Sequence, residues 1–370
     1  MLAGLWYRPE VYGAGSDRTA AIHGEAMNVR ENVGLIDVST LGGLEIRGPD
    51  AAEMMERMYT WAYKKQQVGR ARYTLMTDMT GVITDDGVAC RFDDKHFYVT
   101  ATTSGVDGVY KEMLFWNAQW RLKVDVTNVT GAYSGVNIAG PKSREVLAKL
   151  TDEDISADGF PYMGVRMATV AGIPCRMLRV GFVGELGFEI HCPAHSGEAL
   201  WDAIMEAGST YGMHTMPAEV TNTRRMEGGL LFAGTDFDET MTPFEAGFGS
   251  LIDWEKGDFI GRDALSQADQ RRRTWGLTCA GGTALHGDTV FINGVPSGRV
   301  TSSAFSPTLQ MGIAIVQLAD ADLGPGTQVE VLCADGKMHK GQVSELPLID
   351  RGGDIPRGRD PQQPIEDPSV

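Results

Sequence analysis

Residues 43–58, GLEIRGPDAAEMMERM, carry the pattern that decides the fold, because a second copy, GVNIAGPKSREVLAKL, follows at residues 135–150 with an offset of 92. Each copy has a short apolar strand, a Gly-Pro turn and a helix with apolar residues at helical spacing. Residues 96–113 and 187–204 form a second pair, in which a strand again leads through small residues into a helix. The repeat predicts a pseudo-symmetric α+β body with antiparallel sheets, although a common supersecondary motif could imitate it.

The composition changes after the segment DFIGRDAL (258–265). Beyond it the chain is rich in short apolar strands, such as MGIAIVQL (311–318) and TQVEVLC (327–333), which Gly and Pro punctuate at short intervals. This pattern predicts a small all-β barrel or sandwich. The tail from Arg351 has four prolines and almost no apolar content, so we expect a solvated strap or a disordered end.

Length and charge exclude several classes of protein. The 370 residues suggest two or three packed units. The balance of 33 basic against 49 acidic residues, a net charge of −16, argues against a nucleic-acid partner, because such binding needs clustered Lys and Arg. The five cysteines form no CxxC pair and their number is odd, so we expect a reduced, cytoplasmic setting. We expect no signal peptide and no membrane span, because no apolar run approaches roughly 20 residues.

Two acidic segments are candidates for chemistry, and we expect no metal site. Asp85 and Asp86 follow a hairpin turn, and adjacent residues on a strand point to opposite faces, so at most one can face a given pocket. A partly desolvated carboxylate there could accept a proton or hold an amine; the alternative is a solvent-facing turn acid.

Glu185 lies in a Gly-flanked bend of RVGFVGELGFE (179–189). Its carboxylate could pair with an edge that carries N–H and NH2 groups, as in a pterin, through both oxygens. Gly184 and Gly187 would let such a ring approach the backbone. The alternative is an ordinary turn motif.

These segments, in this order, resemble the folate-dependent aminomethyltransferase family, which comprises the glycine-cleavage T-protein and its relatives. The resemblance runs from about Arg30 to Leu348 and is carried by 33–51, 71–88, 136–147, 179–190, 224–247, 258–265 and 298–316. WYRPEVY (6–12) and GELGFEI (184–190) look more similar to the folate-binding C-terminal half of heterotetrameric sarcosine oxidase alpha subunits, here expected to stand alone without a flavin domain.

The resemblance implies a three-domain ring around a central folate channel. The expected division is a discontinuous β-rich domain (1–47, 108–131 and 214–265), a duplicated ferredoxin-like domain (48–107 and 132–213), a C-terminal β-barrel or jelly-roll domain (268–350) and a tail (351–370).

The same resemblance implies roles for single residues. The second aspartate of the family's pair matches Asp86, the catalytic residue, and the family tyrosine before the hairpin matches Tyr73. The pterin-binding glutamate matches Glu185, preceded by Gly184, and a family arginine matches Arg225, a candidate to hold the glutamate tail of the folate. Asp86 could orient N5 of tetrahydrofolate, take up its proton or stabilise an iminium-like intermediate, and these roles stay open.

Two departures from the T-protein pattern bear on the reaction. Thr102, which the resemblance places among the cofactor-binding residues, stands where T-proteins carry a folate-site asparagine, and Ala233 stands where they commonly carry tyrosine. We therefore expect a tetrahydrofolate-dependent methyl or methylene transferase, or demethylase, that acts on a small methylated or other C1 donor. The alternatives are the T-protein itself with a lipoyl carrier, a non-catalytic folate-binding protein, or a detached oxidase subunit with a flavoprotein partner.

Overall fold

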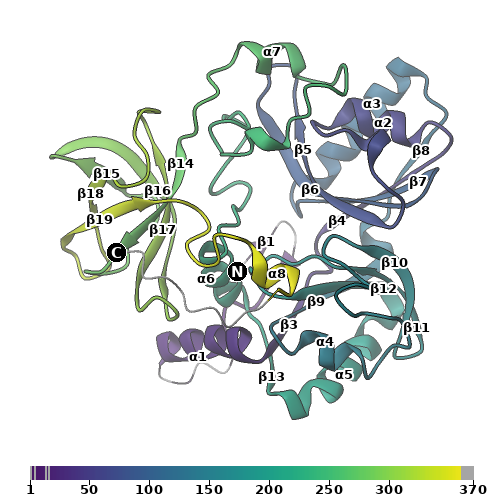
Figure 1. Cartoon of the computed structure of the whole chain (residues 1–370), viewed down its shortest axis with the longest axis horizontal. Coiled ribbons are helices and arrows are strands. Elements are labelled where there is room, and N and C mark those ends of the chain that lie inside the picture. The colour runs from purple at the N-terminus through teal and green to yellow at the C-terminus, as the bar shows by residue number, and fades with distance from the viewer. Residues whose placement is uncertain (1, 4–5, 13–14, 16, 360–370) are drawn as a thin grey trace.

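The structure is a computed structural model that describes residues 2–3, 6–12, 15 and 17–359. The described residues form a five-stranded sheet, a six-stranded sheet and a closed six-stranded barrel, besides a ribbon of β1 (Leu2–Ala3) and β2 (Trp6–Tyr7). Figure 1 shows the barrel on one side, the two sheets on the other, and helix α6 (Ala218–Glu227) between them. These parts confirm the predicted α+β class with a C-terminal barrel.

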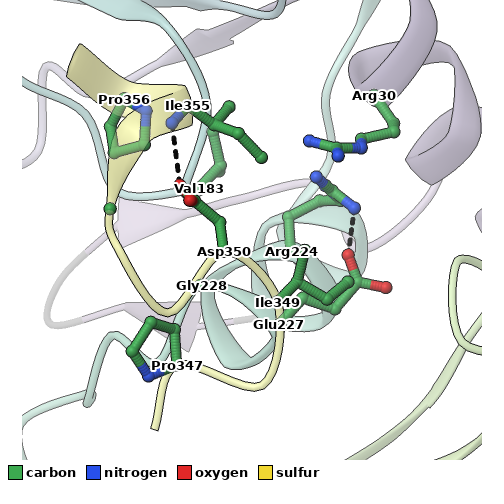
Figure 2. A pocket seen from close by; sticks show the side chains of 12 residues that line it. Arg30, Val183, Arg224, Glu227, Gly228, Pro347, Ile349, Asp350, Ile355 and Pro356 are labelled. Atoms are coloured by element: carbon green, nitrogen blue, oxygen red, sulfur yellow. Dashed lines mark hydrogen bonds and ion pairs between the residues drawn. The ribbon is translucent and has the colours of Figure 1, made fainter. Parts of the chain in front are cut away.

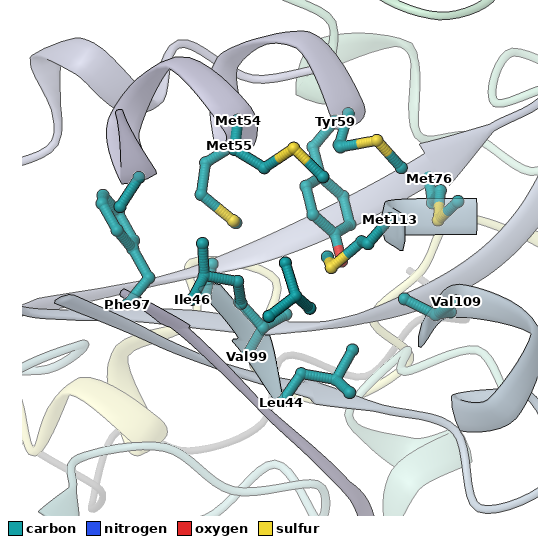
Figure 3. Close-up of a cluster of buried hydrophobic side chains, with 14 of the residues drawn as sticks. Leu44, Ile46, Met54, Met55, Tyr59, Met76, Phe97, Val99, Val109 and Met113 are labelled. Carbon is teal, nitrogen blue, oxygen red and sulfur yellow. The ribbon is translucent and has the colours of Figure 1, made fainter. Parts of the chain in front are cut away.

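The first copy of the repeat builds the five-stranded sheet, whose strand order is β5-β6-β7-β4-β8. Its elements are β4 (Gly42–Arg47), α2 (Ala51–Met58), β5 (Arg70–Thr77), β6 (Ile83–Asp93), β7 (His96–Ala101), α3 (Val106–Trp120) and β8 (Asp125–Asn128). Helices α2 and α3 cover one face of this sheet. Met54, Met55 and Met113 from the helices pack there against Leu44, Ile46, Phe97 and Val99 from the strands (Figure 3).

The second copy repeats this order as β10-β11-β12-β9. Its elements are β9 (Tyr133–Ala139), α4 (Ser143–Leu147), β10 (Val165–Val170), β11 (Ile173–Leu178), β12 (Gly187–Pro193), α5 (Gly197–Gly208) and β13 (Met213–Thr215). The copies differ at one edge, because β3 (Val33–Asp37) pairs between β9 and β13. The two sheets therefore share the predicted antiparallel plan, apart from the parallel β3–β13 pair.

The Gly-Pro turn of each copy has a conformational reason. Gly48 has φ of +145°, and a Cβ there would lie 2.3 Å from the carbonyl oxygen of Lys123. Gly140, its counterpart, has φ of +128°, and a Cβ would lie 2.5 Å from the carbonyl oxygen of Asn32. Only glycine combines this backbone conformation with such close approach.

The barrel closes in the order β14-β17-β16-β15-β18-β19. Its strands are β14 (Thr274–Cys279), β15 (Thr289–Ile292), β16 (Val295–Ser306), β17 (Met311–Leu318), β18 (Gln328–Leu332) and β19 (Met338–Ser344). The other helices are α1 (Arg18–Glu31), α7 (Arg262–Gln267) and α8 (Asp354–Arg357), with 3-10 turns at η1 (Tyr63–Lys65), η2 (Thr130–Ala132), η3 (Ala194–Ser196), η4 (Ser209–Tyr211) and η5 (Gly249–Leu251).

Strand pairing crosses the boundaries of the expected domain ranges. Strands β4 and β8 pair in the first sheet, and β3 and β13 pair in the second. Of these, β3, β4 and β8 fall in ranges assigned to the discontinuous domain, and β13 begins at Met213, the last residue of the expected ferredoxin-like range. The division into domains itself stays a prediction.

The tail is docked over its described part, contrary to the expectation of a solvated or disordered end. Ile355 on α8 is buried, and the carbonyl of Pro356 accepts a hydrogen bond from Arg179 at 2.7 Å. One apolar side chain and a few backbone groups thus suffice to dock a polar segment. Residues 360–370 of the predicted tail lie outside the described residues. Across the described ranges, none of the helices is long and apolar enough to cross a bilayer.

Candidate active site

The two adjacent aspartates of β6 face opposite sides of the first sheet. Asp85 lies opposite Met76, which belongs to the core beneath α2 and α3. Asp86 lies opposite Leu75, which belongs to the cluster that joins β5 and β6 to α6 and to the barrel. Of the two carboxylates, Asp86 is therefore the one directed towards the junction of the sheets and the barrel.

Tyr73 holds Asp86. Its hydroxyl donates a hydrogen bond to Oδ2 of Asp86 at 2.7 Å, and its ring lies 5.7 Å from that of Phe248. Burial raises the pKa of Asp86 to about 6, although the hydrogen bond from Tyr73 lowers it. Burial likewise raises the pKa of Tyr73, so the hydroxyl stays a donor. Asp86 thus exchanges a proton close to neutral pH, as a general base requires.

Thr102 is hydrogen-bonded to Asp85, on the opposite side of the sheet from the Asp86 side chain. Its backbone N–H donates to both carboxylate oxygens of Asp85 at 3.3 Å. Its Oγ accepts the N–H of Gly105 at 3.0 Å, just before α3 begins. Thr102 therefore closes the turn between β7 and α3.

Glu185 is enclosed by arginines. Its Oε1 accepts from Arg30 of α1 at 3.0 Å and also from Arg224 of α6. Arg224 is paired in turn with Glu227 (Figure 2). The hydroxyl of Ser306 also donates a hydrogen bond to Glu227. Burial raises the pKa of Glu185, and the two guanidinium groups oppose this shift.

A cavity lies beside this cluster, and its size decides whether a pterin fits there. Its volume is about 40 Å³, which is room for a few waters but not for a bicyclic ring. It is lined by Arg30, Val183, Gly184, Arg224, Glu227, Gly228 and, from the C-terminal segment, Pro347, Ile349, Asp350, Gly353, Ile355 and Pro356 (Figure 2). The carboxylate of Glu185 suits a pterin edge in its chemistry. A ring there requires either displacement of residues 347–356 or approach to Oε2 from outside this cavity.

Gly184 has a packing role in this geometry. Its φ is +68°, and a Cβ there would lie 3.0 Å from the Cα of Gly228. The bend therefore packs backbone against backbone on the end of α6. This contact explains the glycine without a ligand.

Arg225 is placed differently from its expected role at the mouth of a folate channel. It makes five hydrogen bonds to described residues, as many as the guanidinium has N–H groups, and is 3% exposed. Its partners are Asn222, the carbonyl of Leu230, Asp236 and Ser302. Arg225 links α6 to the barrel, and its N–H groups are committed to protein acceptors, while its role in holding the glutamate tail of the folate stays a prediction.

The structure thus gathers the predicted residues into two groups that α6 connects. Tyr73 and Asp86 share one group, and Glu185 and Gly184 the other. Arg30 and Arg224 were missed by sequence reasoning. Arg224 had a weak signal, because it precedes Arg225 in a family motif, whereas nothing local marks Arg30.

The fold defines the class of protein. It superposes on the crystal structure of glycine cleavage system aminomethyltransferase T from Bartonella henselae with a TM-score of 0.81, over 93% of this chain and 92% of that chain, at 23% identity. The GCVT N-terminal domain family matches residues 1–256, and the glycine cleavage T-protein C-terminal barrel domain family matches residues 272–350. The chain belongs to the glycine-cleavage T-protein family, and the predicted resemblance is confirmed.

Two kinds of curated relative share this sequence. The chain is 36% identical to sarcosine oxidase subunit alpha of Corynebacterium sp. (strain P-1), over 94% of this chain but 37% of that protein. It is 34% identical to the aminomethyltransferase of Caldanaerobacter subterraneus subsp. tengcongensis over 82% of each chain, and 32% identical to that of Streptomyces avermitilis over 94% and 92%. The chain thus spans little more than a third of the sarcosine oxidase subunits but most of the aminomethyltransferases. The comparisons therefore confirm the family, and the activity of this chain is a proposal.

Proposed function

We propose that the protein is a tetrahydrofolate-dependent one-carbon transferase that moves a methyl or methylene group from a small methylated or other C1 donor to N5 of tetrahydrofolate. The hydrogen-bonded pair of Asp86 and Tyr73, directed towards the junction of the sheets and the barrel, carries this proposal. Membership of the T-protein family supports it.

The proposed chemistry asks three things of the chain. N5 must be unprotonated and directed at the carbon, and orientation alone can lower the barrier by several kcal/mol. Asp86 takes up or orients the proton, since its pKa of about 6 leaves it ionised at neutral pH. Glu185 would hold the pterin edge, within reach of the positive charges of Arg30 and Arg224.

The identity of the C1 donor distinguishes the proposed function from its alternatives. Thr102 and Ala233 depart from the T-protein pattern, which favours a free small donor over a lipoyl carrier. Similarity to sarcosine oxidase subunit alpha across 94% of the chain favours a second candidate, in which a flavoprotein partner supplies the one-carbon unit. The cytoplasm remains the proposed location, because all five cysteines are free of disulfides.

The decisive experiment is incubation with tetrahydrofolate and a panel of N-, S- and O-methylated donors, with 5-methyl- and 5,10-methylene-tetrahydrofolate measured by mass spectrometry. Turnover with a free donor, lost in Asp86→Asn, supports the proposal. A strict need for a lipoylated carrier or for a flavoprotein selects the corresponding alternative. Folate binding without turnover in all these assays would select the alternative of a non-catalytic folate-binding protein.

A further inference from the structure

Asp85 is a buried carboxylate that the proposed reaction does not use. It is 5% exposed and lies directly behind Asp86 on β6. Burial is costly for a carboxylate unless its oxygens are hydrogen-bonded.

These contacts join the backbone of Asp86 to the start of α3. The N–H of Asp86 donates to Oδ1 of Asp85 at 2.9 Å, and the N–H of Thr102 donates to both oxygens. The turn leaves just enough room, because a Cβ on Gly105 would lie 2.8 Å from Oδ2. One carboxylate thus fixes the peptide that carries Asp86 and the turn that begins α3.

The link between Asp85 and the Asp86 peptide lies next to an irregularity in the strand pairing. The pairing of β5 with β6 shifts register between Met76 and Thr77, next to the residue opposite Asp85. Such an irregularity bends the strand next to Asp85, so this end of the strand pair lacks the regular pairing that continues from Asp86 towards Arg91.

We propose that Asp85 is a positioning residue, which ties the Asp86 peptide to the β7–α3 turn and so directs the Asp86 carboxylate at the reacting atoms. This inference deepens the proposed function and rests on it. Thr102 then acts through Asp85, and its difference from the T-protein asparagine affects the support of the catalytic residue. Thr102 does not itself touch the folate in this scheme.

The titration of the pair reports whether the two carboxyl groups lie close enough to interact. The titratable groups whose charge interacts with Asp85 are Tyr59, which follows α2, and Asp86 and Tyr73 on the other face of the strand pair. Burial, followed by repulsion from Asp86, raises the pKa of Asp85 to about 7. Two coupled carboxyls lose their protons in two macroscopic steps that belong to the pair.

The test compares Asp85→Asn and Asp85→Ala with Asp158→Asn, an exposed control. We expect Asp85→Ala to lower kcat by about 10- to 100-fold at unchanged KM for tetrahydrofolate, as a small misplacement of a reacting group does. Asp85→Asn keeps an oxygen for the Asp86 N–H, so it should recover part of this loss. Wild-type kcat and pH profile in both variants, when Asp86→Asn is inactive, would overturn the inference.

A second measurement needs no turnover. The carboxyl carbon of Asp86, followed by NMR during a pH titration, should show two steps in the wild type and one in the near-isosteric Asp85→Asn. An unchanged two-step curve would also overturn the inference. A wild type with no transfer to tetrahydrofolate would instead count against the proposed function, while the titration still decides the link between the two aspartates.

Discussion

The protonation of Asp86 governs the pH dependence that we expect of the protein. Its pKa of about 6 means that the proton-accepting carboxylate is populated only above that pH. The value of kcat/KM should therefore rise as the pH increases through about 6. Asp86→Asn should lower turnover by about 10²-fold or more while folate affinity changes less. Steady-state rates between pH 5 and 8 check both points, and wild-type rates in Asp86→Asn would remove Asp86 from the reaction.

Glu185 carries the prediction for folate affinity. Glu185→Gln keeps the shape but removes the charge, so one or two charge-assisted hydrogen bonds to a pterin are lost. We expect affinity for tetrahydrofolate to fall by about 10- to 100-fold, which corresponds to about 1.5–3 kcal/mol. Calorimetry with the exposed control Glu198→Gln measures this, and circular dichroism confirms folding. Equal affinities in both variants would place the pterin elsewhere.

At the scale of elements, Thr102 closes the turn that leads into α3, a 15-residue helix whose N-cap is Gly105. Its hydroxyl accepts the N–H of Gly105 at 3.0 Å, and the carbonyl oxygen of Thr102 accepts the same N–H at 3.2 Å. Thr102→Val keeps the shape and removes one of the two acceptors of this N–H, so the free energy of unfolding should fall by about 0.5 kcal/mol. Urea denaturation measures the change. Unchanged stability would show that water replaces the hydroxyl at no cost.

Helix α6 depends on Arg225 for its attachment to the barrel. Removing one partner of a buried ion pair costs about 3–5 kcal/mol, because the other charge is left without compensation. Arg225→Met leaves Asp236 buried, so we expect a loss of that order in the free energy of unfolding. The double variant Arg225→Met/Asp236→Leu should recover much of it. If Arg225→Met is as stable as the wild type but binds folate weakly, the sequence-based role of Arg225 as a folate contact is supported.

Local patterns predicted the elements because their causes are local. The repeat could be predicted from the apolar spacing of residues 51–58 and from Gly48 and Gly140, where the backbone requires glycine. The alternation of a strand separated Asp85 from Asp86 in the same way. The contacts of Arg30 with Glu185, 155 positions apart, leave no local trace, and neither does the docking of Ile355. Long-range partners of polar side chains were therefore beyond the sequence, as Arg225 illustrates.

At the scale of the whole molecule, the two sheets meet through a buried polar cluster. Arg176 on β11 pairs with Glu45 on β4 and also donates to the hydroxyl of Tyr133 at 2.6 Å. Tyr98 on β7 and His191 on β12 make a second link, with 3.1 Å between the hydroxyl and Nδ1. Apolar residues from both sheets, among them Cys90 and Leu178, surround these contacts. The two sheets are thus joined by an ion pair that forms only while Glu45 is ionised, so its strength depends on pH.

Glu45 sets the direction of that dependence. Burial raises its pKa, but the contacts with His96 and Arg176 outweigh this and lower the pKa to about 2 from an ordinary value of 4.5. The unfolded chain therefore takes up this proton first as the pH falls, so the stabilisation is complete above pH 4.5 and is lost towards pH 2. The shift corresponds to about 3 kcal/mol. Urea denaturation at several pH values should show the largest deficit of Glu45→Gln above pH 4.5, and a smaller deficit with each step towards acid. The exposed control Glu198→Gln should follow the wild type throughout. A deficit of Glu45→Gln that stays constant with pH would mean that Glu45 holds the halves together by its shape and hydrogen bonds, with no contribution from its charge.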